Sequence, residues 1–304
     1  MRRDEGPSGI LLLDKPAGVT STRALAITKR LLASRKGGHT GTLDPFATGL
    51  LPLAFGEATK FSRFLLDADK GYLATLVLGQ TSSTGDIEGS LSPKLDIDVD
   101  ADRIAEVTAS FVGEQDQIPP MYSALHYEGR RLYELAREGV EVPRAPRRVT
   151  IHTLEVGEIV GEKVTISVKC SKGTYIRTLA EDIGKRLGLG AYLCALRRTH
   201  VGDLHLSDAV TLEHLEQADP TARSLRLMPP ERFVERLPRV SLDAAGAAAF
   251  CHGQRVNQTG AEGEVTVFRE AGDFLGVGRR DGAGGLFAVR LMAGTPKADS
   301  PDFA

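Results

Sequence analysis

Short apolar runs alternate along the chain with stretches in which apolar residues recur every three or four positions. Residues 9–14, GILLLD, form the first short run, and the turn residues after it predict a buried strand. Residues 71–79, GYLATLVLG, predict a second strand. Residues 24–33, ALAITKRLLA, have helical spacing and follow Thr20 and Ser21, either of which can cap a helix.

A hairpin and a strand-to-helix junction are predicted further along. Residues 147–156 and 162–170 alternate apolar and polar positions, so they predict antiparallel strands around a turn at residues 157–161. Residues 171–188, SKGTYIRTLAEDIGKRLG, turn directly into a helical pattern, and residues 191–206 predict another strand.

Three segments in the first half complete this part of the pattern. Residues 57–68, EATKFSRFLLDA, and residues 102–113, DRIAEVTASFVG, predict helices. Residues 117–149 are dense in proline, tyrosine and arginine, which indicates a long excursion from a compact core. Loops of this length are usually functional or disordered.

The texture changes from about residue 238, after the proline-rich MPPERFVERLP. An alanine-rich helix at 242–253 precedes three short strands, EVTVFRE, DFLGVGRR and LFAVRLM, which is the pattern of a small β-barrel. We expect the tail at 295–304 to be unordered. The whole pattern predicts an α+β protein with a mixed, largely antiparallel sheet flanked by helices.

Composition and charge limit the classes of protein that fit these elements. Of 304 residues, 41% are hydrophobic and 26% are charged, enough for a sizeable core. The net charge of −2 argues against coating of nucleic acid or membrane by bulk charge, so a polyanion would need a local basic patch. The three cysteines fit neither a disulfide framework nor a zinc pattern, and no apolar run is long enough for a membrane span. We therefore expect a cytoplasmic protein.

One carboxylate interrupts an otherwise basic segment. From Lys15 through Leu43 the chain has six Lys or Arg residues, Lys15 included, and no acid. Asp44 follows within GGHTGTLDP. Asp44 before Pro45 could simply cap a turn, and the glycines with Arg35, Lys36 and His39 could instead attract an anion, although no P-loop sequence follows. A nucleophile or base whose pKa a nearby cation holds low is a third interpretation.

A second group of polar residues lies at the junction in residues 170–184, CSKGTYIRTLAEDIG. Arg177 could pair with Glu181 one helical turn later, or it could reach Asp44 as an ion-pair partner. Tyr175 in this segment and Tyr72 near the start of a strand fit the core of a protein. Both also fit a cleft in which aromatic rings stack on unpaired bases.

Six segments in order resemble one family, the bacterial tRNA pseudouridine-55 synthases (the TruB family). They are LLLDKPAGVTS at 11–21, GGHTGTLDPFATGLLPLAFGEATK at 37–60, GYLATLVLGQTSSTGDIEG at 71–89, IPPMYSALHYEGRRLYELAREGVEVPRAPR at 118–147, CSKGTYIRTLAEDIG at 170–184 and ALRRTHVG at 195–202. The resemblance spans roughly residues 9–210, and the end of the chain is similar to the PUA-like barrel of bacterial members. It implies a catalytic domain at 1–237, with an RNA-gripping insertion at about 118–148, and an RNA-binding PUA-like domain at 238–304.

The resemblance also implies roles for particular residues. Asp44 matches the catalytic aspartate, Tyr72 the tyrosine that stacks on the flipped base, and Arg177 the arginine paired with the aspartate. Three residues match positions that line the nucleotide pocket: His39, Tyr175 and Leu196. Lys15 matches the lysine of the first motif. His126 stands where the family usually has lysine, which puts one RNA contact in doubt.

The implied reaction isomerises uridine 55 in the TΨC loop of tRNA, with no cofactor and no metal. The implied partner is tRNA alone, bound by a monomer without a protein partner. The uridine must leave its stack, at a cost of a few kcal/mol, and basic side chains on phosphates would offset part of that cost. Candidates for these contacts are Arg35, Lys36, Arg130, Arg131, Arg144, Arg147 and Arg148.

Two other classes of function remain open from the residues. An RNA-binding or RNA-folding module with a vestigial pocket would use the same barrel and basic insertion. Phosphoryl transfer at the glycine-rich loop would require a metal ion. The joint presence of Asp44, Tyr72 and Arg177 favours the synthase over both.

Overall fold

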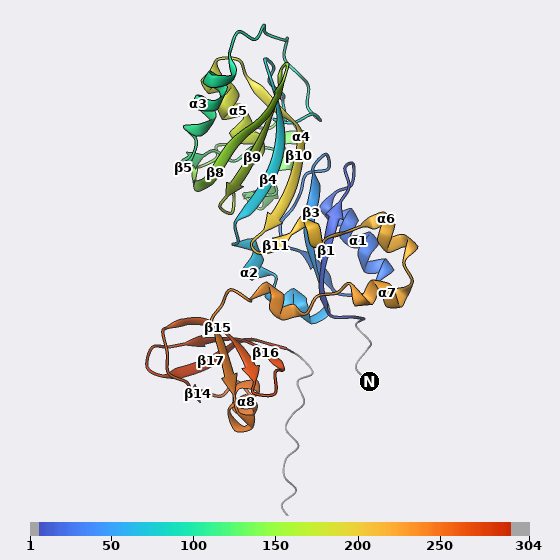
Figure 1. The fold of residues 1–304 in the computed structure, drawn as a ribbon, viewed down its shortest axis with the longest axis vertical. Coiled ribbons are helices and arrows are strands. Elements are labelled where there is room, and N and C mark those ends of the chain that lie inside the picture. Colours follow the sequence, from blue (N-terminus) through green and yellow to red (C-terminus); the bar gives the residue numbers. More distant parts are fainter. Residues whose placement is uncertain (1–5, 293–304) are drawn as a thin grey trace, which may run out of the picture.

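The computed structural model describes residues 6–292, in which two main β-sheets are surrounded by helices (Figure 1). The larger sheet has the order β12-β1-β3-β10-β4-β9-β8-β5, with β2 beside β3 and β11 beside β10. Its strands are β1 (Gly9–Lys15), β2 (Gly37–His39), β3 (Thr48–Phe55), β4 (Lys70–Leu78), β5 (Gly113–Gln117), β8 (Arg147–Val160), β9 (Lys163–Cys170), β10 (Ala191–Val201), β11 (Leu204–His205) and β12 (Val210–Thr211). The β1–β12 and β3–β10 pairs are parallel and the others antiparallel, so the predicted mixed, largely antiparallel sheet is confirmed.

The sheet is buried on both faces near its centre. Along β1, Leu11 and Leu13 belong to one apolar cluster, whereas Ile10 and Leu12 belong to a second cluster on the other face. Because successive side chains of a strand point to opposite faces, the continuous run GILLLD is what a doubly covered strand requires.

Helices and 3₁₀ turns lie beside this sheet (Figure 1), and cap residues mark where helices begin and end. The hydroxyl of Thr20 accepts from the backbone N–H of Arg23, and Gly188 ends the helix after the junction with a φ of 77°. The helices are α1 (Ser21–Leu31), α2 (Arg63–Leu66), α3 (Ala101–Ala109), α5 (Ile176–Leu187), α6 (Leu212–Gln217) and α7 (Pro220–Leu225), with short 3₁₀ turns η1 (Gly56–Phe61), η2 (Leu206–Asp208) and η3 (Pro230–Phe233). Among residues 6–292, no helix combines the length and apolar character needed to cross a bilayer.

The insertion carries a small hairpin and a helix of its own. β6 (His126–Tyr127) pairs with β7 (Arg130–Arg131), and α4 (Leu132–Arg137) follows directly. Leu132 and Leu135 of α4 are buried, so the excursion predicted from the sequence is folded against the rest of the chain.

The C-terminal sheet is five-stranded, in the order β13-β15-β16-β17-β14, and curls around one helix (Figure 1). Its elements are β13 (Arg239–Leu242), α8 (Ala244–Cys251), β14 (Val256–Asn257), β15 (Gly263–Arg269), β16 (Phe274–Arg280) and β17 (Gly285–Leu291). The rings of Phe61 and Phe274 lie 5.2 Å apart in an apolar cluster shared with the larger sheet. Lys60 Nζ also donates to the carbonyl of Leu291 at 3.0 Å, so this part is packed against η1.

Several predicted elements differ from the structure. The expected helix at 57–68 is a 3₁₀ turn followed by the four residues of α2, and Ser62 between them keeps a helical backbone without joining them into one α-helix. The start of the expected loop at Gly37 forms β2, and the turn expected at 157–161 is shorter because β8 continues to Val160. Pairing with neighbouring strands, which local pattern does not report, also creates β5, β13 and β14. The expected tail at 295–304 lies outside the described residues.

Candidate active site

The loop that carries Asp44 is tied to the end of β1 and the start of α1. The Ser21 hydroxyl donates to the Leu43 carbonyl at 3.0 Å and accepts from the Leu43 N–H at 2.8 Å. On the other side of Asp44, the Gly18 N–H donates to the Pro45 carbonyl at 2.8 Å. Asp44 is therefore fixed from both of its neighbours, which places its carboxylate without using the carboxylate as a cap.

Lys15 closes the same connection. Its side chain is fully buried, and Nζ donates to the carbonyls of Pro16, Val19 and Pro45 at 2.9, 2.7 and 3.3 Å. Burial lowers the pKa of Lys15 to about 8, and the nearby Asp44 charge acts in the opposite direction. These contacts make Lys15 a link between the end of β1 and the loop that carries Asp44.

Arg177 reaches Asp44 from the first turn of α5. Its Nε lies 3.0 Å from Asp44 Oδ2, and its Nη2 lies 3.4 Å from Oδ1. The remaining donors are used by the carbonyls of Thr84 at 2.9 Å and Tyr122 at 2.7 Å. With only 4% of its side chain exposed, Arg177 is held by these partners and points to Asp44 instead of to Glu181.

Asp86 is a third member of this cluster that the sequence alone did not single out. Its Oδ2 lies 3.6 Å from Arg177 Nη1, and both side chains are 4% exposed. Oδ1 accepts from the hydroxyl of Thr84 at 2.6 Å and from the N–H of Glu88 at 3.0 Å. The only feature of the sequence that points to Asp86 is an acidic residue directly after a glycine in TSSTGDIEG. That pattern alone also fits an exposed turn.

The pKa of Asp44 is raised, which reverses the direction expected from the sequence. Burial is the larger cause, and the neighbouring Asp86 charge adds to it. The guanidinium of Arg177 opposes both, through its charge and its hydrogen bond. About a third of the Asp44 side chain remains accessible, so the carboxylate is partly desolvated and still open to a bound molecule.

Tyr72 lies near the start of β4, half-buried against the main apolar cluster. It is paired across the sheet with Val168 of β9 and Arg198 of β10. Burial raises the pKa of its phenol, Arg198 acts to lower it, and the Asp44 charge also acts on it. The structure thus brings Asp44 and Arg177 into direct contact, and the charge of Asp44 also acts on the pKa of Tyr72.

Tyr175 and Leu196 flank this cluster. Tyr175 precedes α5, and its backbone is held by the side chain of Gln117, whose Oε1 accepts at 2.8 Å and whose Nε2 donates at 3.1 Å. Burial raises the pKa of the Tyr175 phenol, and the charges of Asp44 and Arg177 act on it as well. Leu196 lies opposite Ala74 on the β4–β10 ladder and is 7% exposed, so it supplies an apolar wall.

His39 ends β2, half-buried, on the strand next to β3. Burial lowers its pKa, and the charge of Arg198 acts in the same direction. Its Nδ1 is buried without a hydrogen-bond partner among the described residues. The lowered pKa favours a neutral imidazole ring at this position.

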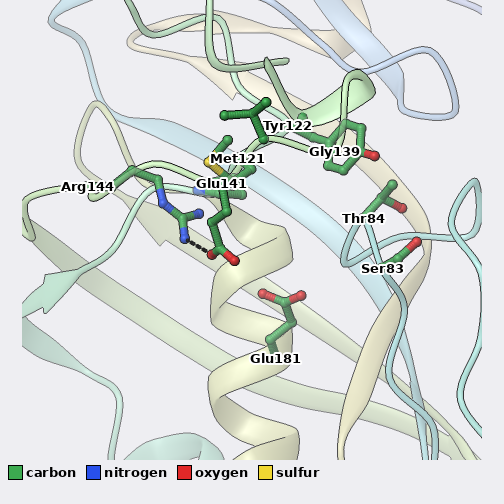
Figure 2. Close-up of a pocket in the computed structure, with 11 residues that line it drawn as sticks. Ser83, Thr84, Met121, Tyr122, Gly139, Glu141, Arg144 and Glu181 are labelled. Carbon is green, nitrogen blue, oxygen red and sulfur yellow. Dashed lines mark hydrogen bonds and ion pairs between the residues drawn. The ribbon is translucent and has the colours of Figure 1, made fainter. Parts of the chain in front are cut away.

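A cavity of about 310 Å³ lies beside the cluster, between the turn after β4, the insertion and α5 (Figure 2). Thr84 and Tyr122, whose carbonyls hold Arg177, also line this cavity. The carboxylates of Glu141 and Glu181 point toward one another in it, and Arg144 is ion-paired to Glu141 at 2.8 Å. The insertion therefore packs over the arginine that contacts Asp44.

The basic side chains proposed to meet phosphates are mostly exposed, and three of the seven, Arg130, Arg144 and Arg148, are paired with acids. Arg130 lies 2.5 Å from Glu138, and Arg148 lies 3.1 Å from Glu114. His126 is exposed on β6, opposite Arg131. The acidic partners explain how the net charge stays near zero despite this basic segment.

Family comparisons cover most of the chain. Residues 29–176 match the family described as "TruB family pseudouridylate synthase (N terminal domain)". Residues 177–235 match "tRNA pseudouridylate synthase B C-terminal domain", and residues 238–292 match "Pseudouridine synthase II TruB, C-terminal".

Similar proteins and structures agree with these matches. The tRNA pseudouridine synthase B of Dechloromonas aromatica (strain RCB) is 51% identical over 285 residues, covering 93% of this chain and 95% of that protein. The protein of the same name from Azoarcus sp. (strain BH72) is 52% identical over 286 residues, covering 94% and 95%.

A crystal structure of the archaeal box H/ACA sRNP Nop10–Cbf5 complex aligns with a TM-score of 0.72 and 27% identity, over 97% of this chain and 88% of that chain. A structure of an H/ACA RNP bound to a substrate RNA containing 2′-deoxyuridine aligns equally well, with a TM-score of 0.72 and 26% identity, over 98% and 92%. The curled C-terminal sheet is accordingly a PUA-like domain. The chain belongs to the TruB family of pseudouridylate synthases, isomerases that convert uridine into pseudouridine.

Proposed function

We propose that this enzyme isomerises uridine 55 in the TΨC loop of tRNA. The observation that carries the proposal is the contact of Arg177 with Asp44 beside Tyr72, in a cluster that is buried but accessible at the carboxylate. The names of the similar proteins, tRNA pseudouridine synthase B, support tRNA as the substrate.

Asp44 is the proposed nucleophile: its carboxylate oxygen forms a bond to the uridine, and this bond breaks again before the product leaves, which regenerates the aspartate. The C1′–N1 bond breaks, the uracil rotates, and C1′ joins C5; the proton on C5 is lost and N1 gains one, so nothing is oxidised or hydrolysed. Arg177 orients the carboxylate through a two-point contact and balances its charge. Tyr72 stacks on the uracil and assists in removal of the C5 proton, while His39, Tyr175 and Leu196 line the nucleotide pocket.

A uridine in a folded loop reaches this cluster only if it is everted from the stack, which costs a few kcal/mol. Stacking on an aromatic ring is worth about 1–3 kcal/mol per base and offsets that cost. We propose residues 1–237 as the catalytic domain, with the insertion at about 118–148 gripping RNA, and 238–304 as the RNA-binding domain. The enzyme acts in the cytoplasm as a monomer.

Incubation of the pure protein with unmodified tRNA, followed by mass-spectrometric mapping of pseudouridine, tests the proposal. We expect one pseudouridine per tRNA, at position 55. Conversion at another uridine would overturn the assignment of the position, and modification of a free TΨC stem-loop would show that this segment suffices for recognition.

A further inference from the structure

Arg198 is a buried cation to which the reaction outlined above gives no role. It lies on β10, where its cross-strand neighbours are Gly49 of β3 on one side and Tyr72 of β4 on the other. Its side chain is among the largest fully buried ones and is 1% exposed. A charged group is costly to bury unless its partners are specific, so its contacts indicate what it does.

Those contacts link two separate parts of the site. Arg198 Nε donates to the Leu50 carbonyl at 2.7 Å, and Nη2 donates to the Gly41 carbonyl at 3.2 Å. Gly41 begins the turn that leads to Asp44. Arg198 therefore holds the loop of the proposed nucleophile against the centre of the sheet.

The third partner is Tyr72. Directly opposed residues of an antiparallel pair project from the same face of the sheet, so the side chain of Arg198 lies beside that of Tyr72. Among the titratable groups of residues 6–292, Tyr72 is the one that favours the charged form of Arg198. The cation is thus held by two carbonyls, with the phenol next to it.

The chemistry of the two groups fixes how they can interact. A guanidinium carries only donors, so a hydrogen bond between the two side chains would run from Arg198 to the oxygen of Tyr72, and the hydrogen of the phenol would point elsewhere. The positive charge of Arg198 also opposes the rise that burial causes in the pKa of the phenol. The charge and the donors of Arg198 therefore both act at the phenolic oxygen.

We propose that Arg198 is a positioning residue for the isomerisation, which fixes the phenolic oxygen of Tyr72 and the Gly41 turn relative to one another. It does so without contacting the RNA. The proposal rests on the proposed roles of Tyr72 and Asp44 in the reaction.

The first test compares Arg198→Lys with Arg197→Lys. Arg197 is its neighbour on β10 but projects from the other face, where it is paired with Asp14 at 2.6 and 3.1 Å. Lysine at position 198 keeps the charge but cannot reach all three partners. We expect its single-turnover rate constant to fall about 10- to 100-fold, with unchanged affinity for the RNA, whereas Arg197→Lys should react like the wild type.

The second test leaves Arg198 in place. In protein labelled with ¹⁵N-arginine, Tyr72→Phe removes the phenolic acceptor, so the guanidinium signals of Arg198 should shift and exchange faster with water. In Arg198→Met, loss of the charge should raise the pKa of Tyr72. This pKa is measured from the ultraviolet absorbance of tyrosinate, after subtraction of the same titration of the Tyr72→Phe variant, which reports the other tyrosines.

Three results would overturn the proposal: a folded Arg198→Lys enzyme that reacts at the wild-type rate, an equal loss of rate in Arg197→Lys, or guanidinium signals of Arg198 that do not respond to Tyr72→Phe. The spectroscopic measurements need neither RNA nor turnover. A wild-type protein that forms no pseudouridine would therefore refute the proposed function. The spectroscopic measurements would still show whether Arg198 contacts Tyr72.

Discussion

Arg177 contacts Asp44 through two of its nitrogens although 133 positions separate the two residues in the chain. Asp44 is held by a loop tied to β1 and α1, and Arg177 by the start of α5. Two rigid parts of the protein therefore meet at one ion pair. The functional consequences of that pair can be measured.

Asp44→Asn should abolish pseudouridine formation and leave RNA binding nearly normal. The amide keeps the shape of the side chain but is a far weaker nucleophile, and Asp44 does not hold its loop through its carboxylate. Single-turnover assays by mass spectrometry and equilibrium binding of a TΨC stem-loop measure the two properties. Asp67→Asn, an exposed acid paired with Lys172, is the control, and substantial turnover by Asp44→Asn would remove the proposed mechanism.

Arg177→Met should lower the free energy of unfolding by about 3–5 kcal/mol, because it leaves buried carboxylates without their cation. It also strips the carbonyls of Thr84 and Tyr122 of their donor. Urea denaturation measures the change. Arg103→Met, at an exposed pair on α3, should change it by less than about 0.5 kcal/mol, and equal effects of both substitutions would contradict the structure.

The stability difference between Asp44→Asn and the wild type should depend on pH. Burial raises the pKa of Asp44 in the folded state above its ordinary value of 3.8. As pH rises above 3.8, the unfolded wild type loses this proton before the folded protein does, so the wild type loses stability relative to the amide. Below 3.8 both states are protonated and the difference is constant. Urea titrations across this range measure it, and a difference that shrinks with rising pH would show a lowered pKa instead.

Arg147→Ala combined with Arg148→Ala should flatten the fall of log affinity for RNA with log salt. Each phosphate contact that is lost removes about 0.7–0.9 from the slope. Lys94→Ala with Arg103→Ala removes two exposed, acid-paired cations outside the insertion and should leave the slope unchanged. If the two double variants gave the same slope, the phosphates would be bound elsewhere.

Gly49→Ala should destabilise the protein more than Gly18→Ala. Both glycines have positive φ values, 99° and 75°, so both substitutions carry a conformational cost of about 1–3 kcal/mol. Only at Gly49 would the added Cβ lie 2.4 Å from the carbonyl oxygen of Arg198, whereas nothing lies within 4 Å of it at Gly18. Thermal unfolding of both variants measures the difference, which isolates the close approach of β3 to β10.

Local sequence determined most of the regular elements. The run at Gly9–Lys15 is apolar throughout because β1 is covered on both faces, and α1 begins where Thr20 can cap it. The helix expected at 57–68 is instead a 3₁₀ turn and a short α-helix, and Phe61 and Leu65 within it pack in a cluster with Phe274 of the C-terminal sheet, a contact that lies far away in sequence.

The sequence by itself also determined the family, through six ordered motifs, and with it the roles that we expect for Asp44, Tyr72 and Arg177. Tertiary structure alone decided how these groups act on one another. The raised pKa of Asp44 depends on how many neighbours exclude water from it, and the parts of Asp86 and Arg198 depend on which strands lie side by side. Burial and hydrogen-bond partners are properties of the packed chain, so no local pattern of residues could report them.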